Sequence, residues 1–187
     1  DVEELVTQLS RYPLDFVLVS SHCFMGSDPY QEDMFQNRDP IAVCRSYLQD
    51  LYTCLRRIDP ALFSALAHLD YLAKGFGATY LPDGLFRYAY APDEMDALMR
   101  YAIEHGHCIE INTSCPQSLC GNDAPVLGWL KRYHELGGEF VTFGSDAHQV
   151  RRFGEGLELA KERAREAGIR YVATYTAMQP ELHLLGD

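Results

Sequence analysis

The segment that decides the fold is EFVTFGSDAH, residues 139–148. Its first half, EFVTF, is rich in aromatic and β-branched side chains, which is typical of a buried strand. The strand leads directly into Gly144, and then into Asp146 and His148 two residues apart. In an extended chain two such residues point the same way, so we expect both to face one site. We expect Gly144 to let backbone or ligand approach closely.

Four further segments have the character of short strands. They are FVLVS (16–20), FSALA (63–67), CIEIN (108–112) and YVATY (171–175). Helices are predicted between the strands, over about 40–58, 92–106, 123–137 and 155–167. This alternation predicts a single α/β domain over residues 1–187, with a parallel sheet covered by helices. Periodicity leaves open whether the sheet is doubly wound or part of a barrel.

Polar side chains come at the same end of four of these strands. His22 follows the first strand, His68 the second, Asn112 ends the third, and Asp146 and His148 follow the fourth. Any one of them alone is better explained as a hydrogen-bonded structural residue. Together they predict a site, because the carboxyl ends of parallel strands meet at one edge of the sheet. Imidazole and carboxylate are ligands that suit zinc, iron or manganese.

The remaining histidines are interpreted as structural. His105 and His107 close a helix and precede a strand, so they are expected at the opposite edge of the sheet. His134 lies on a surface-like helix, and His183 lies in the tail. We find no Ser-His-Asp order and no reactive-cysteine pattern that would predict a protein nucleophile.

Composition limits the possible partners. The net charge is −11, with 16 basic and 27 acidic residues, and a surface this acidic repels nucleic acid. No apolar run approaches the roughly 20 residues that a membrane span needs. The first residues, DVEELVTQLSRYPLD, do not have the pattern of a signal peptide, so a cytoplasmic location is expected. A small phosphorylated substrate remains compatible, because bound metal inverts the local field.

Four blocks of this sequence resemble those of the PHP phosphoesterases. The block at 15–22, DFVLVSSH, is similar to the third conserved block of the family, and AHLD at 67–70 resembles its Gly-His-hydrophobic-Asp block. EINTS at 110–114 looks like a block of the histidinol-phosphatase branch, and GSDAH at 144–148 is similar to the final metal block. The blocks occur in the expected order over nearly the whole chain.

The resemblance implies a partial (β/α) barrel of the PHP type, a distorted TIM-like fold with parallel strands and outer helices. It implies up to three divalent metals, zinc, manganese or iron, with His22 and His68 on one, Asp146 on a second and His148 on a third. Asp146 and His148 would be catalytic, and Asn112 would lie on the substrate side. The implied reaction is hydrolysis of L-histidinol phosphate to L-histidinol and phosphate, in histidine biosynthesis.

Two arginines are candidates for gripping the phosphate. Arg87 lies in a long loop, and Arg151, with Arg152 beside it, follows the final metal block. A solvated surface position is the plainer explanation for each one. The tyrosines of the same loop, such as Tyr88, are explained equally well by pocket shape or by core packing.

The pattern departs from the family at its start. The opening His-x-His block, the next His block and the bridging Glu block are absent, and 187 residues is short of the roughly 250 of a full β/α barrel. We therefore expect an N-terminally truncated domain with weak activity, and an oligomer is possible because a partial barrel exposes sheet edges. The alternatives are a PHP enzyme of other specificity, a non-catalytic remnant used in assembly, and a hydrolase of the wider amidohydrolase type.

Overall fold

The computed structural model describes residues 2–28, 30–31 and 34–186. Its strands form one sheet of six, in the order in which they occur along the chain. They are β1 (Leu18–Val19), β2 (Ala65–Leu66), β3 (Cys108–Asn112), β4 (Phe140–Gly144), β5 (Tyr171–Thr176) and β6 (Gln179–Leu184).

The strand order decides between the two architectures that the sequence left open. β1 to β5 are parallel, each paired with the next, and only the β5–β6 pair is antiparallel. A doubly wound sheet reverses its strand order at a switch point. These five strands run in one direction without reversal, which is the connectivity of a β/α barrel. β1 and β6 lie at the two ends of the sheet.

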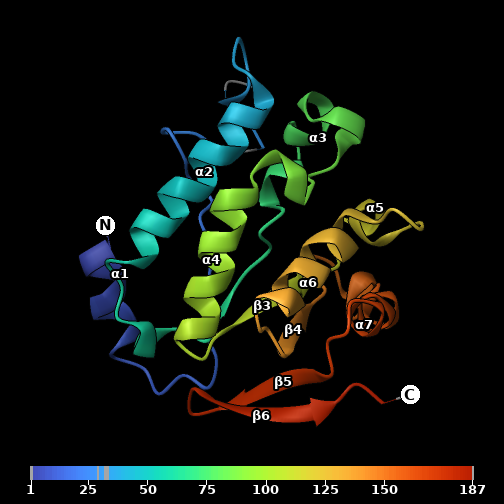
Figure 1. Cartoon of the computed structure of the whole chain (residues 1–187). Helices are drawn as coiled ribbons and strands as arrows, with labels where there is room; N and C mark the ends of the chain where they lie inside the picture. Colours follow the sequence, from blue (N-terminus) through green and yellow to red (C-terminus); the bar gives the residue numbers. More distant parts are fainter. Residues whose placement is uncertain (1, 29, 32–33, 187) are drawn as a thin grey trace.

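All four predicted helices are present between the strands, with additional short ones. The longer helices are α1 (Val2–Leu9), α2 (Pro40–Leu55), α4 (Pro92–Glu104), α6 (Pro125–Glu135) and α7 (Leu157–Glu166). The short helices are α3 (Gly77–Tyr80), α5 (Pro116–Leu119) and 3-10 turns at Pro60–Leu62, Tyr71–Ala73, Pro82–Gly84, Tyr88–Tyr90 and Val150–Arg152. Neighbouring pairs α2–α4, α4–α6 and α6–α7 pack against one another around the sheet (Figure 1).

The ends of these helices show why they form where they do. Asp39 caps α2: its carboxylate accepts from Ile41 N at 3.2 Å and Ala42 N at 3.3 Å. At α6 the cap position is Ala124, and no side chain caps it. The carboxylate of Asp123 is instead paired with Arg87 at 2.9 Å.

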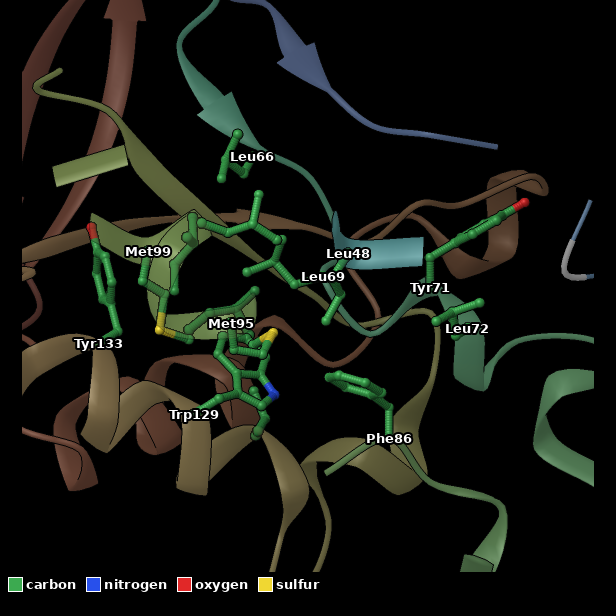
Figure 2. Close-up of a cluster of buried hydrophobic side chains, with 14 of the residues drawn as sticks. Leu48, Leu66, Leu69, Tyr71, Leu72, Phe86, Met95, Met99, Trp129 and Tyr133 are labelled. Carbon is green, nitrogen blue, oxygen red and sulfur yellow. The ribbon is translucent and has the colours of Figure 1, made fainter. Parts of the chain in front are cut away.

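The core lies between the helices and the sheet (Figure 2). It is built from large side chains that are almost fully buried, contributed by α2, β2, α4 and α6 among others. They include Leu48, Leu66, Leu69, Leu72, Phe86, Met95, Met99, Trp129 and Tyr133. Burial of each such side chain contributes about 1.5–3 kcal/mol. This core holds the strands in register and so fixes the positions of the residues at their ends.

Two predicted strands are shorter than expected. β1 and β2 have two residues each, where five were predicted. Pairing nevertheless extends past their ends, since Ser64 N donates to Val17 O at 2.8 Å and Ala67 N donates to Val19 O at 2.9 Å. The segments that contain β1 and β2 therefore stay aligned up to the residues that precede His22 and His68.

β6 was not predicted. Every residue of it is at least partly exposed in an edge position, and it carries Pro180, which argues against a central strand. The turn before it places Ala177 and Met178 at positive φ, 49° and 65°, without the Gly or Asn that usually marks such a hairpin. Among the described residues, no helix combines the length and apolarity needed to cross a bilayer.

Candidate functional site

The imidazoles of His22 and His68 lie side by side at the carboxyl ends of β1 and β2. Their Nε2 atoms are 3.1 Å apart, and their ring centroids are 5.1 Å apart. The ring of Tyr71 packs against both, with centroids 4.6 Å from His22 and 4.8 Å from His68. The structure therefore brings together two residues that are 46 positions apart in the sequence.

The environment of His68 keeps its imidazole neutral. Burial and then the nearby charge of Lys74 lower the pKa of His68 to about 4. A neutral imidazole is the form that ligates a metal. Two nitrogen ligands of a tetrahedral zinc, each about 2.0–2.1 Å from the ion, lie about 3.3 Å apart. The 3.1 Å between the two Nε2 atoms fits such a pair.

The pair does not make a complete ligand set by itself. Within residues 2–28, 30–31 and 34–186, no group of three or more His, Cys, Asp or Glu side chains is arranged to hold a metal ion. A metal held by His22 and His68 would therefore need ligands beyond those that the described residues gather around it.

Asp146 faces a lysine at the carboxyl end of β4. Its Oδ2 accepts from Lys74 Nζ at 2.7 Å and from Ser114 Oγ at 3.2 Å. Burial works against its ionisation, but the hydrogen bond and charge of Lys74 outweigh that and hold the pKa of Asp146 below its usual value. Asp146 is thus an ionised carboxylate that already has a cationic partner.

The chain is not extended between Asp146 and His148 as we expected, although both side chains line one cavity. Asp146 has φ of +49°, so the chain turns at this residue and is not extended. The side chain of His148 is 87% exposed, and its Nδ1 lies 2.9 Å from the backbone oxygen of Asp146. His148 stands at the rim of the site while Asp146 points into it.

Asn112 links Glu110 on β3 to Ser114 and Lys74. Its Oδ1 accepts from Ser114 N at 3.0 Å, from Ser114 Oγ at 2.6 Å and from Lys74 Nζ at 3.4 Å. Its Nδ2 donates to Glu110 Oε2 at 3.3 Å. These contacts fix the orientation of a side chain that is only 6% exposed.

Lys74 is a residue at this site that sequence reasoning missed. It follows the block at 67–70 by four residues, just after the 3-10 turn Tyr71–Ala73. Its position in a loop carries no strand or helix periodicity, so only its proximity to His68 in the sequence signalled it. The side chain is 6% exposed and lies 5.5 Å from the ring centre of Tyr71.

A cavity of about 250 Å³ opens beside these residues. Its lining includes Lys74, Ser114, Asp146, His148 and Arg152. This volume is at the lower end for small-molecule sites, which is suitable for a small polar group.

Neither of the two predicted phosphate-binding arginines lines this cavity. Arg87 lines a different cavity and pairs with Asp123 at 2.9 Å and Asp83 at 3.8 Å. Arg151 is exposed and donates to Gln149 at 2.8 Å. Its neighbour Arg152 lines the cavity beside Asp146, although it pairs with Glu155 at 2.7 Å. Arg152 is therefore better placed than Arg151 for an anionic ligand.

The two histidines that we interpreted as structural, His105 and His107, line another cavity with Pro60 and Pro180, away from this site.

Comparison with known proteins gives consistent matches. The chain is 31% identical over 164 residues to a probable histidinol-phosphatase of Clostridium acetobutylicum, and 28% identical over 152 residues to one of Thermotoga maritima. It is 23% identical over 178 residues to a histidinol-phosphatase of Lactococcus lactis. The chain is thus similar to these histidinol-phosphatases over most of its own length. No protein-family model matches it.

The fold agrees with this relationship. The crystal structure of the histidinol phosphate phosphatase of Lactococcus lactis superposes with a TM-score of 0.82 over 96% of this chain, at 22% identity. That structure contains zinc, L-histidinol and phosphate. The predicted α/β fold of the PHP type is confirmed. This chain spans 61% and 58% of the first two relatives and 66% of the crystallised protein.

Proposed function

We propose that this chain carries one part of the active site of a metal-dependent phosphatase that hydrolyses L-histidinol phosphate to L-histidinol and phosphate. The observation that carries the proposal is the 3.1 Å contact between the Nε2 atoms of His22 and His68. It brings two imidazoles into ligand spacing at the mouth of a barrel-type sheet. Support comes from three histidinol-phosphatase relatives and from the ligands of the crystallised protein.

The metals are divalent ions held in part by His22, His68 and Asp146, with His148 at the rim. When bound, such ions neutralise the charge of a phosphate monoester and lower the pKa of a bound water. The residues of this chain hold and orient the reactants. His68 is kept neutral by burial, Asp146 is kept ionised beside Lys74, and Ser114, which Asn112 holds by a hydrogen bond, lines the cavity.

In this proposal the chain is a single domain of the PHP barrel type. The metal site needs ligands beyond those that the described residues bring together. Histidine biosynthesis in the cytoplasm is the setting that we infer for the reaction. The acidic surface, with a net charge of −11, supports a small-molecule substrate over a nucleic acid.

Substrate choice tests the proposed specificity. The chain, extended at its N-terminus by the missing ligand blocks and loaded with Zn²⁺ or Mn²⁺, is assayed for phosphate release. The kcat/KM for L-histidinol phosphate is expected to exceed that for glucose 6-phosphate and for serine phosphate by at least about 100-fold, about 3 kcal/mol of discrimination. Equal turnover of all three esters would instead support a PHP enzyme of other specificity.

One observation favours a second function. The described residues do not gather three metal-binding side chains in one place, which is what a non-catalytic remnant used for assembly would show. The two functions differ in their response to His68→Ala. A remnant keeps its partner binding and has no activity to lose, whereas the phosphatase loses metal binding and turnover.

A further inference from the structure

A buried carboxylate outside the predicted ligand set joins the strand ends that carry the site. Glu110 lies in the middle of β3 and is 4% exposed. Its Oε2 accepts from the backbone N of His68 at 2.9 Å and from Nδ2 of Asn112 at 3.3 Å. One oxygen thus fixes the backbone of one site residue and the side chain of another.

The second oxygen of Glu110 explains a glycine of the final block. A Cβ built on Gly144 would lie 2.0 Å from Glu110 Oε1 and 3.0 Å from its Cδ. Glycine at the last position of β4 therefore makes room for the carboxylate of Glu110, where the sequence suggested a close approach of backbone or ligand. Glu110 touches the ends of β2 and β4 from its place on β3, between them.

Simple packing does not account for a carboxyl group at this position. Burial disfavours the charged form, and an apolar side chain of similar volume would fill the space at lower cost. What an apolar side chain lacks is an acceptor for the N–H of His68 and the amide of Asn112. A buried donor without a partner is costly, so the acceptor has a function here.

We infer that Glu110 is a positioning residue of the proposed site. It sets His68 through the backbone, and it sets Asn112 so that Oδ1 faces Ser114 and Lys74. Lys74 in turn holds Asp146. The inference rests on the proposed function only in that these residues form the proposed site. It adds Glu110 as the residue that aligns His68 with Asn112.

Two variants separate alignment from packing. Glu110→Gln keeps an oxygen that accepts from both donors, and Glu110→Leu keeps the bulk but removes the acceptor. The full chain is compared without metal, in the presence of a chelator, with Glu139→Gln as the control on an exposed glutamate. The readouts are the imidazole ¹⁵N spectra of His22 and His68 and the exchange rate of the His68 amide, with circular dichroism to monitor folding.

The expected result is that Glu110→Gln and the control keep the wild-type imidazole spectra and slow exchange of the His68 amide. Glu110→Leu is expected to stay folded, to lose the spectrum of the paired imidazoles and to exchange the His68 amide at least about 100-fold faster. A folded Glu110→Leu chain with wild-type spectra and exchange would overturn the inference. So would equal changes in the Gln and Leu variants.

Gly144→Ala provides the second test, and it decides the outcome if Glu110→Leu does not fold. The new methyl group displaces the carboxylate, so the same change in the His68 spectrum and exchange is expected. Unchanged spectra in a folded Gly144→Ala chain would overturn the inference. None of these readouts requires metal or a phosphate ester, so they stand or fail separately from the proposed phosphatase activity.

Discussion

Lys74 sets the charge balance among the residues of the site. Its ammonium group is nearly buried between Asp146 and Asn112 and stands over the ring of Tyr71. It favours the ionised form of Asp146 and disfavours a proton on His68. Both effects act in the same direction, since the deprotonated forms of carboxylate and imidazole are the ones that bind metal.

Replacing Lys74 by Met tests this balance. The variant is expected to have a higher pKa at Asp146, because burial is then no longer outweighed by the lysine. Loss of a charged hydrogen bond at a partly buried pair is also expected to cost about 2 kcal/mol of stability at pH 7. Carboxyl ¹³C titration and urea unfolding measure the two effects. Lys131→Met on an exposed lysine is the control, and an unshifted Asp146 pKa would contradict the account.

The burial of His68 predicts a pH dependence of stability. The folded pKa of about 4 lies below the usual histidine value of 6.5, so the unfolded chain binds more protons between these values. The stability of the metal-free chain is therefore complete above pH 6.5 and falls by about 3 kcal/mol as the pH drops to 4. His68→Gln should flatten that slope in urea unfolding measured at several pH values. A slope that stays the same in the variant would show that another group causes it.

At the level of residues, part of the site was predictable. The strand-end rule predicted the approach of His22 and His68, and the structure brings them together. The turn of the chain at Asp146 was missed because the left-handed conformation of Asp146 is not visible in a sequence that lacks glycine there. Lys74 was missed because it belongs to a loop. The ligand and catalytic roles assigned to these residues remain predictions.

The helices form where their end signals are strongest. Asp39 followed by Pro40 starts α2, and the structure shows the carboxylate on two backbone N–H groups. Asp39→Ala is expected to lower the free energy of unfolding by about 1 kcal/mol, since those donors lose their partner. Ser46→Ala, on the exposed face of the same helix, is the control and should change stability by less than about 0.5 kcal/mol. Equal effects in thermal unfolding would show that the cap contributes nothing.

Strands were less predictable than helices, for a physical reason. β3 was predicted to the residue because it is buried on both faces and reads as a continuous run. β6 was missed because edge strands carry no such run, and its turn uses Ala177 and Met178 at positive φ. A run of apolar residues indicates a buried strand, and β6 lacks such a run because it is exposed.

The molecule as a whole is a barrel-type sheet with an exposed strand at each end. β1 lies at one end, where Leu18 is 40% exposed, and β6 lies at the other. An exposed edge strand is a template for pairing with further chain. The sequence predicted the parallel α/β class, but the choice of a barrel needed the strand order, because periodicity does not record which strands are neighbours.

The most direct test of the account measures phosphate release from L-histidinol phosphate by the chain extended at its N-terminus with the missing His and Glu blocks. The account predicts turnover that requires Zn²⁺ or Mn²⁺ and that falls by about 100-fold or more in His68→Ala. A folded, metal-loaded chain that releases no phosphate, or a His68→Ala variant with full activity, would contradict it.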